Sequence, residues 1–262
     1  MIDTHTHLDD ERFPDREEII AALPQNGVEF VINNSCNFST MHSGLRLAKD
    51  HRRVFCTVGC HPEDAAAFDD TFAAEMVRLA AEKKVLAVGE IGLDYHYEPF
   101  EKTVQQKAFV WQLHLAHELH LPVNIHLRDA YGDMADVLTA NRTLLADGGV
   151  MHCYAGSVEY ARRMLDLGFS FAFGGVITFP NARKEEVVRF LPADRILTET
   201  DGPYLAPVPV RGSVNVPQNV RYVLAAMARM RGTSAEQLEA QIRENVFRLY
   251  PKLQPYREEL RL

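Results

Sequence analysis

The sequence predicts an α/β fold in which eight βα units close into a single barrel, and two observations support this prediction. Eight short β-branched or apolar runs alternate with longer stretches of helical pattern, which is the spacing of units that form parallel sheets. The chain has 262 residues and is 47% hydrophobic, so it can bury a large core, and its length is close to the roughly 250 residues typical of one closed barrel. We therefore expect one domain over residues 1–262, a TIM-type (β/α)8 barrel.

The strand candidates follow one another along the chain, and helical patterns fill the intervals between them. The predicted strands are residues 1–7, 29–33, 54–59, 85–90, 123–126, 149–152, 169–173 and 195–200. The clearest helical patterns cover residues 69–83, 101–120 and 158–167. One extra C-terminal helix is expected over residues 234–250, where Thr233 or Ser234 can cap the first turn.

The acidic composition argues against a protein that binds nucleic acid through an overall basic surface. The 36 Asp and Glu residues outnumber the 28 Lys and Arg residues, which gives a formal net charge of −8. A polyanion would therefore have to be bound locally. Carboxylates that hold cations would not present bare negative charge to such a substrate.

The cysteine pattern and the N-terminus predict a cytoplasmic protein that does not bind membranes. The four cysteines, Cys36, Cys56, Cys60 and Cys153, form no Cys-x-x-Cys pair, which argues against a zinc finger or a disulfide framework. The sequence does not begin with a basic and then apolar segment, and no run approaches the 18 apolar residues of a membrane span.

Six side chains of metal-ligand type stand at the ends of the predicted strands. His5 and His7 lie two residues apart on the first strand, so their side chains face the same way. The other four end later strands and are Glu90, His126, His152 and Asp201. Because the carboxyl ends of the strands in such a barrel converge around one opening, we expect the six side chains to form one metal site.

The number and type of these ligands predict two divalent metal ions. Imidazole nitrogens and carboxylate oxygens suit zinc and, with more carboxylate and water, manganese or magnesium. Four histidines and two carboxylates are too many for one tetrahedral ion with an open position. We assign His5, His7 and Asp201 to one ion and His126 and His152 to the other, with Glu90 as the bridge.

A pair of ions also suggests the chemistry. Two ions about 3.5 to 4 Å apart can clamp both the attacking and the leaving oxygen of a displacement at phosphorus. Asp201 can orient the attacking water or accept its proton, because a ligand carboxylate keeps a second oxygen free. We therefore expect Asp201 and Glu90 to be the catalytic residues.

Six motifs occur in this order along the chain: MIDTHTHLD, TVGCHPED, VGEIGLDYH, NIHLRDA, HCYAGS and TETDGPYLAPVPVRG. Together they resemble the TatD-type metal-dependent deoxyribonuclease family, a branch of the amidohydrolase-like barrels. The resemblance implies a distorted (β/α)8 barrel, divalent-metal dependence and hydrolysis of DNA phosphodiester bonds. It places metal ligands at the same six positions, and exonuclease action from one end is likewise its implication.

The chain departs from the usual pattern of that family at three positions. Leu127 stands where the family usually has Ser, Gly202 where Ala is frequent, and Val216 where the family commonly has Glu between an Asn and a Pro. None of the three is a predicted ligand. The departures therefore concern substrate preference rather than metal binding.

Three further side chains are candidates for substrate contact. His61 follows the third strand and either donates to a phosphate oxygen or bonds its own turn. Arg128 shares strand parity with His126, and its guanidinium either binds phosphate or pairs with a loop carboxylate. Tyr154 shares parity with His152 and either stacks on a base or sugar or packs in the barrel wall.

Three carboxylates near the predicted ligands are expected to have supporting roles. Glu199 and Asp3 share strand parity with Asp201 and His5. They either orient ligand imidazoles or make structural hydrogen bonds inside the barrel. Asp94 in the GLDYH segment is expected to shape a loop.

The run of His114, His117 and His120 is not expected to bind metal. The apolar stripe of its helix is predicted to run through Val104, Ala108, Trp111 and Leu115. At 100° per residue His117 and His120 rotate away from that stripe toward solvent. The run also lies on the outer ring of the barrel.

The sequence thus predicts a two-metal hydrolase that cleaves DNA phosphodiester bonds, on single strands or ends, since a buried metal pair is easier for a frayed terminus to reach. An alternative keeps the barrel and the metals but hydrolyses an amide or ester, such as a cyclic amide, a lactone or an aminoacyl ester, as related barrels do. A metal-binding protein without catalysis is a further alternative, against which the complete ligand set argues. Neither a membrane nor an obligate protein partner is implied.

Overall fold

The computed structural model describes residues 1–262 and contains one eight-stranded parallel sheet whose strands follow the order of the sequence. The strands are β1 (Ile2–Thr6), β2 (Phe30–Asn33), β3 (Val54–Val58), β4 (Val85–Asp94), β5 (Val123–Arg128), β6 (Gly149–Met151), β7 (Phe169–Phe173) and β8 (Ile196–Thr198). The predicted TIM-type (β/α)8 fold is confirmed, and each predicted strand has a counterpart.

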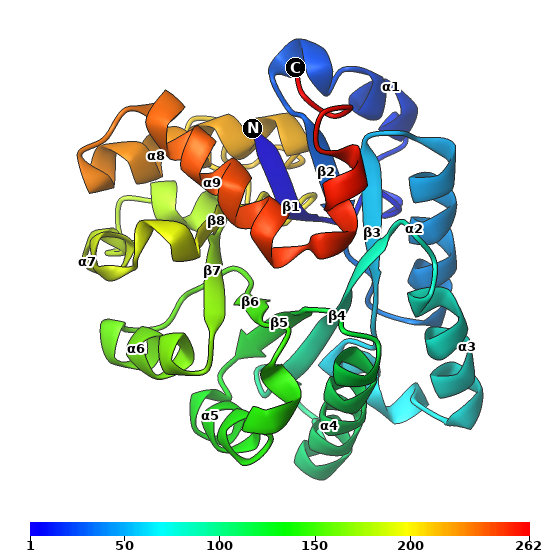
Figure 1. Ribbon diagram of the computed structural model, residues 1–262. Helices are drawn as coiled ribbons and strands as arrows, with labels where there is room; N and C mark the ends of the chain where they lie inside the picture. The colour runs from blue at the N-terminus through cyan, green and yellow to red at the C-terminus, as the bar shows by residue number, and fades with distance from the viewer.

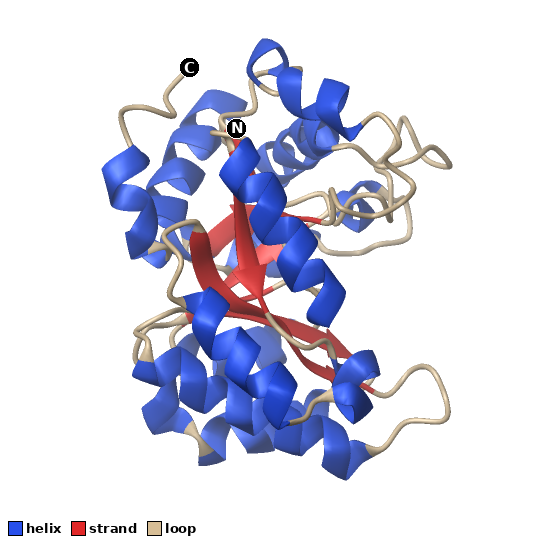
Figure 2. Cartoon of the chain, turned by 90° about the vertical axis from the view of Figure 1, so that its right-hand side faces the viewer, coloured by secondary structure: helices blue, strands red, loops and turns tan.

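Nine α-helices surround these strands (Figure 1). They are α1 (Arg16–Ala21), α2 (Phe38–Asp50), α3 (Asp70–Ala80), α4 (Lys102–Glu118), α5 (Tyr131–Ala140), α6 (Val158–Asp166), α7 (Glu185–Phe190), α8 (Val220–Arg231) and α9 (Ala235–Leu249). Figure 2 shows the strands enclosed by the helices, and both views place the two ends of the chain near each other. The predicted C-terminal helix is α9, and Ser234 caps it by accepting a hydrogen bond from the backbone of Gln237.

The barrel closes between β1 and β8 largely through side chains. Thr4 Oγ1 donates to Thr198 O at 3.0 Å, and Thr198 Oγ1 donates to Ile2 O at 3.0 Å. Beyond the end of β8 the backbone N–H of Asp201 donates to His5 O at 2.8 Å. The barrel is therefore distorted at this seam, which holds the ends of β1 and β8, with their predicted ligands, side by side.

Apolar packing between the strands and the surrounding helices fixes the positions of the strand ends. The strands and the inner faces of the helices form one hydrophobic cluster of 70 buried residues, and close packing of this kind leaves little room for the strands to shift. None of the helices combines the length and the apolar character that a membrane crossing requires. All four cysteines are free thiols.

The buried face of α4 differs from the predicted apolar stripe. Ala108 and Leu115 are buried as expected, whereas Val104 and Trp111 are only half-buried. In the histidine run, His114 and His120 are exposed and His117 is half-buried. The inner face of the helix is therefore rotated relative to the prediction, and polar side chains occupy part of it.

Two buried glutamines on α4 bind the loops at the open end of the barrel. Gln105 accepts from the backbone N–H of Asp94 at 2.9 Å and donates to its carbonyl at 2.7 Å. Gln112 accepts from the N–H of Cys60 at 2.7 Å and donates to its carbonyl at 3.2 Å. Because the two glutamines are seven residues apart, they lie on one face of the helix and fix the end of β4 and the turn after β3.

Candidate metal centre

Glu90 lies at the centre of the cluster, and its two carboxylate oxygens face different histidines. Oε1 lies 2.7 Å from His126 Nδ1 and 3.1 Å from His152 Nε2. Oε2 lies 3.2 Å from His5 Nε2 and 3.7 Å from His7 Nε2. The carboxylate thus divides the four histidines into two pairs, one from β1 and the residue after it, and one from β5 and the residue after β6.

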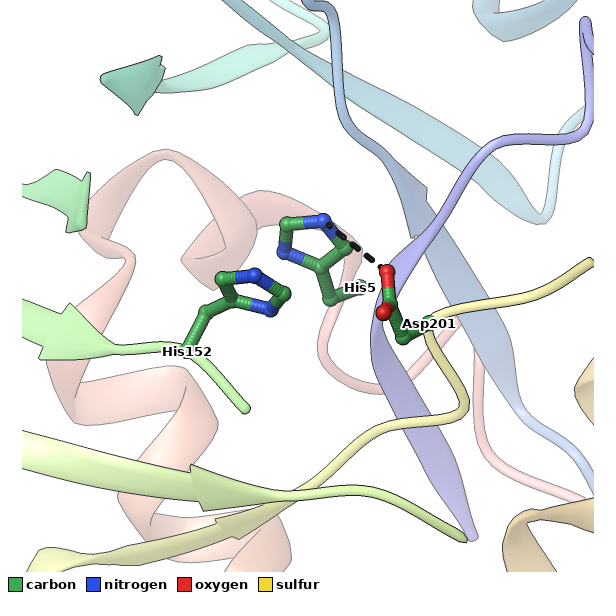
Figure 3. Close-up of side chains that lie close together, drawn as sticks. All are labelled: His5, His152 and Asp201. Atoms are coloured by element: carbon green, nitrogen blue, oxygen red, sulfur yellow. Dashed lines mark ion pairs between the residues drawn. The ribbon is translucent and has the colours of Figure 1, made fainter. Parts of the chain in front are cut away.

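Asp201 lies on the side of the β1 pair. Its Oδ1 is 3.5 Å from His7 Nε2 and 3.8 Å from His5 Nε2. Figure 3 shows this carboxylate turned toward His5, and the ring of His152 beside that of His5. The two rings are stacked with their centroids 3.8 Å apart, so all six predicted ligands meet in one cluster at the open end of the barrel.

The donor set fits divalent cations. Three groups of ligand atoms each lie within 4.8 Å of one another: His5, His7 and Glu90; His5, His152 and Asp201; and His61, Glu90 and His126. Each group combines imidazole nitrogens with a carboxylate oxygen, which is a ligand set that zinc and manganese accept. Such convergence of potential ligands in a closed cluster is what a metal centre requires.

The ring nitrogens that face away from Glu90 also meet protein groups. His7 Nδ1 donates to the carbonyl of Asn34 at 2.9 Å. His126 Nε2 lies 2.9 Å from Asp94 Oδ2. Metal-bound imidazoles commonly donate their second N–H to a carbonyl or a carboxylate, which fixes both tautomer and ring orientation.

Asp94 contributes to the cluster because β4 is longer than expected. The strand runs to Asp94 rather than ending at Glu90, and residues four apart on a strand project to the same face. The sequence predicted only a loop-shaping role for this carboxylate. Its Oδ1 does accept from the N–H of His96 at 2.8 Å, so Asp94 both shapes the loop and contacts His126.

Glu199 and Asp3 differ in their surroundings. Glu199 Oε1 lies 3.4 Å from His152 Nδ1 and accepts from the N–H of Cys153 at 2.5 Å. Asp3 accepts from the N–H of Thr200 at 2.8 Å and from its hydroxyl at 2.5 Å. Glu199 therefore borders the imidazole of a predicted ligand, whereas Asp3 joins β1 to the segment after β8.

The charges of the cluster balance one another. Burial alone would raise the pKa of Glu90, but the surrounding imidazoles lower this pKa well below its usual value. Burial would also raise the pKa of Asp201, but its contact with His7 lowers this pKa below its usual value. Burial would lower the pKa of His152, but the carboxylates of Glu90 and Glu199 raise it well above its usual value. Glu90 and Asp201 are therefore ionised, and a cation that binds here displaces imidazole protons.

His61 shows one of the two roles considered for it, the hydrogen bond within its own turn, and its other ring nitrogen faces the cluster. It is the residue before the short 3₁₀ helix η2 (Pro62–Ala67), and its Nδ1 accepts from the N–H of Glu63 at 3.3 Å. Its Nε2 lies 3.7 Å from Glu90 Oε1. One ring nitrogen thus serves the turn while the other faces the cluster.

The other two candidate substrate residues lie in contrasting places. Arg128 ends β5, and its guanidinium carbon lies 4.8 Å from the centroid of the Tyr97 ring. Asp129, the neighbouring carboxylate, pairs instead with His96 at 2.7 Å. Tyr154 is only 5% exposed, and its hydroxyl donates to the carbonyl of Ser157 at 2.7 Å, a placement that favours packing over stacking on a nucleotide.

Comparisons with known proteins agree with this fold. A model of the family described as TatD related DNase matches residues 2–251. The chain is 37% identical over 252 residues to the metal-dependent hydrolase YabD of Bacillus subtilis, a match that covers 95% of this chain and 98% of YabD. It is 32% identical over 257 residues to the 3'-5' ssDNA/RNA exonuclease TatD of Klebsiella pneumoniae, with 95% and 97% covered. The crystal structure of YjjV, a TatD homologue from Escherichia coli, matches with a TM-score of 0.88 and 32% identity over 96% of this chain and 98% of that one.

Proposed function

The chain belongs to the TatD-related DNase family of metal-dependent hydrolases, and from this premise we propose that it uses two divalent metal ions to hydrolyse DNA phosphodiester bonds. Single strands and frayed ends are the proposed substrates, because the ligands lie in a recessed cluster that a duplex interior would not reach. The name of the Klebsiella relative, a 3'-5' ssDNA/RNA exonuclease, supports a nucleic acid substrate.

The division of the histidines by Glu90 carries this proposal. His5, His7 and Asp201 would hold one cation, and His126 and His152 the other, with one oxygen of Glu90 facing each group. Two cations held in this way supply positive charge to both the attacking and the leaving oxygen of a displacement at phosphorus. A lone tetrahedral ion would leave two of the six side chains without a role.

Residues of the chain itself account for the remaining steps. Asp201 is ionised because its pKa lies below the usual value, so it can accept the proton of the attacking water. Burial, together with the neighbouring His126, lowers the pKa of His61 to about 3. Because His61 Nδ1 accepts from the N–H of Glu63, the neutral ring carries its proton on Nε2, which can donate a hydrogen bond to a phosphate oxygen. Arg128 provides a guanidinium that can bind phosphate through two parallel hydrogen bonds.

Glu90→Ala tests the shared carboxylate. We expect this variant to lose at least one bound ion, counted by inductively coupled plasma mass spectrometry, and to lose oligonucleotide cleavage by about 100-fold or more. Zinc, manganese and magnesium are compared in turn on defined DNA and RNA oligonucleotides. Glu118→Ala is the matched control, because Glu118 is an exposed carboxylate on the outer helix α4.

Two results would count against the proposal. Full activity and full metal content in Glu90→Ala would remove the bridging role of this carboxylate. Turnover of lactones, cyclic amides or aminoacyl esters by the metal-loaded wild type, with no cleavage of DNA or RNA, would replace the nuclease with an amide or ester hydrolase on the same barrel.

A further inference from the structure

Exposed large apolar side chains gather at the open end of the barrel. Six of the eight such side chains lie on loops that follow strands or at the start of the helix after one: Phe38, Tyr97, Tyr204, Leu205, Val208 and Val214. The other two are Val77 and Leu262. Folding gains nothing from leaving such groups in water at the mouth of a site, and clustered exposed apolar groups mark binding surfaces.

Tyr204 presents an exposed ring directly beside the metal cluster. The residue is 45% exposed, and its ring stands edge-on to that of His7 with the centroids 6.1 Å apart. The guanidinium carbon of Arg12 lies 4.1 Å from the Tyr204 centroid. Arg12 is itself held by Asp10 through contacts of 2.8 and 2.7 Å. One face of the ring is therefore covered by a fixed cation, and the remainder is open to a ligand.

The backbone that carries Tyr204 is also fixed. The N–H of Tyr204 donates to Asp201 O at 2.9 Å. The buried side chain of Asn215 donates to the carbonyls of Tyr204 and Thr200, each at 2.8 Å. The ring is thus tied to the segment that supplies a proposed ligand, and little conformational freedom is lost when something stacks on it.

A second arginine–tyrosine pair stands at the other rim of the mouth. Tyr97, in the loop after β4, is 59% exposed and lies under the guanidinium of Arg128. Arg128 follows His126 by two residues on β5. Unlike Arg12, it forms no ion pair with a carboxylate, so its hydrogen-bond donors remain available.

The barrel topology places the two pairs on opposite sides of the cluster. The strands follow the order β1 to β8 around the barrel, and β8 closes against β1. The loops after β8 and β1, which carry Tyr204 and Arg12, therefore lie across the mouth from the loops after β4 and β5. A flexible strand that spans the mouth passes from one pair, over the metal ligands, to the other.

We propose that these two arginine–tyrosine pairs are nucleotide platforms, on which the bases on either side of the scissile phosphodiester stack. This inference rests on the proposed nuclease function and assigns the selection of single strands to named side chains. A base can stack on an aromatic ring only when it is free of its own helix, and every base offers a π-face, so the platforms accept any sequence but only unpaired nucleotides. Arg12 holds the ring of Tyr204 in place, whereas Arg128 both covers the ring of Tyr97 and binds a flanking phosphate.

Tyr204→Ala and Tyr97→Ala test the platforms. On a single-stranded oligonucleotide we expect each variant to raise KM by about 5- to 150-fold, the range that loss of one base–aromatic stack implies, with metal content and melting temperature unchanged. Tyr204→Phe and Tyr97→Phe keep the ring and should keep the wild-type KM. The matched control is Tyr222→Ala on α8, where the guanidinium carbon of Arg221 lies 4.8 Å from the Tyr222 centroid but the Tyr222 ring does not pack on a predicted ligand.

Abasic substrates make the test specific to stacking. Replacement of the bases that flank the cleavage position by abasic nucleotides should raise KM for the wild type and have little further effect on the alanine variants, because the same contact is already lost. Alanine variants with the wild-type KM and the wild-type response to abasic sites would overturn the platforms while leaving the nuclease intact. Should the wild type cleave no nucleic acid, the nuclease proposal fails separately. Fluorescence anisotropy with the same oligonucleotides then decides whether binding depends on the two tyrosines and on the bases.

Discussion

At the scale of single residues, His7 and His126 each use one ring nitrogen toward the cluster and the other for a contact with a protein group. The ring nitrogens that face Glu90 are available to a cation, while His7 Nδ1 and His126 Nε2 are held by Asn34 and Asp94. A histidine that is held from behind meets a cation without having to be reoriented, so its affinity depends on the supporting group as well as on the ring.

Asp94→Asn isolates one of these supports. The substitution keeps the shape of the side chain but removes the charge beside His126 Nε2, and we expect the affinity for one of the two proposed ions to fall by about 10- to 100-fold. The other ion should bind normally, because Asp94 contacts neither His5 nor His7. Competitive titration with a metal-sensitive dye measures both affinities.

Asp129→Asn is the control for this prediction. Asp129 is the next carboxylate along the mouth and pairs with the exposed His96. Equal weakening of both ions in Asp94→Asn, or of neither, would show that Asp94 does not act through His126.

Contacts between individual side chains were harder to predict from the sequence than the elements or the fold. Strand alternation was enough to select His5, His7, Glu90, His126, His152 and Asp201, because each stands where an apolar run ends. Asn34 O accepts from His7 Nδ1, and Asn124 Nδ2 lies 3.2 Å from His5 Nδ1. These contacts depend instead on register between strands. That register shifts between β1 and β2 and again between β4 and β5, and no single-strand pattern encodes such a shift.

At the scale of elements, α4 shows how a helix on the outer ring takes part in the site. Its apolar periodicity predicted the helix itself, and the structure has it at Lys102–Glu118. The periodicity gave only part of the inner face, however: Ala108 and Leu115 are buried as predicted, but Gln105 and Gln112 are buried there as well, for their hydrogen bonds to Asp94 and Cys60. Buried polar side chains with backbone partners are invisible to a hydrophobic pattern.

Gln112→Met tests the link between α4 and the turn that carries His61. Methionine keeps the volume but leaves the N–H of Cys60 without a partner, which we expect to cost about 1–3 kcal/mol of the free energy of unfolding. Because the loosened turn precedes His61, KM for an oligonucleotide should rise as well. Urea denaturation and steady-state kinetics provide the two measurements.

The neighbouring glutamine is the matched control. Gln106 lies on the same helix, is half-buried and binds only side chains, Tyr95 and Asp133, at 3.2 Å. Gln106→Met should change stability by no more than about 0.5 kcal/mol. A similar loss in both variants would point to the helix as a whole rather than to the hydrogen bonds with Cys60.

At the scale of the whole molecule, the barrel converts distance in sequence into proximity. Most of the chain separates Asp201 from His5 in the sequence. The backbone N–H of Asp201 nevertheless donates to the carbonyl of His5, because the last strand closes against the first. The fold class and the end of the barrel that carries the site were predictable from this alternation of elements. The loop surfaces at the mouth were not, since exposed residues such as Tyr97 and Tyr204 follow no period.

The net charge of −8 predicts how binding of nucleic acid depends on salt. The overall negative charge of the protein does not attract a phosphate backbone. At the mouth of the barrel, Arg12 is already paired with Asp10. Arg128 is then the one arginine of the two platforms that is free to bind a phosphate. One such contact with a single strand gives a slope of about −0.7 for the logarithm of affinity against the logarithm of salt concentration, so KM should rise only about threefold between 50 and 200 mM salt.

The measurement is a series of KM values at fixed free metal concentration. Arg128→Gln should flatten the slope nearly to zero, whereas Arg221→Gln, which alters a similar pair on α8, should leave it unchanged. A wild-type slope steeper than about −3 would require several further phosphate contacts and would mean that the strand follows a basic path other than the one across the two tyrosines.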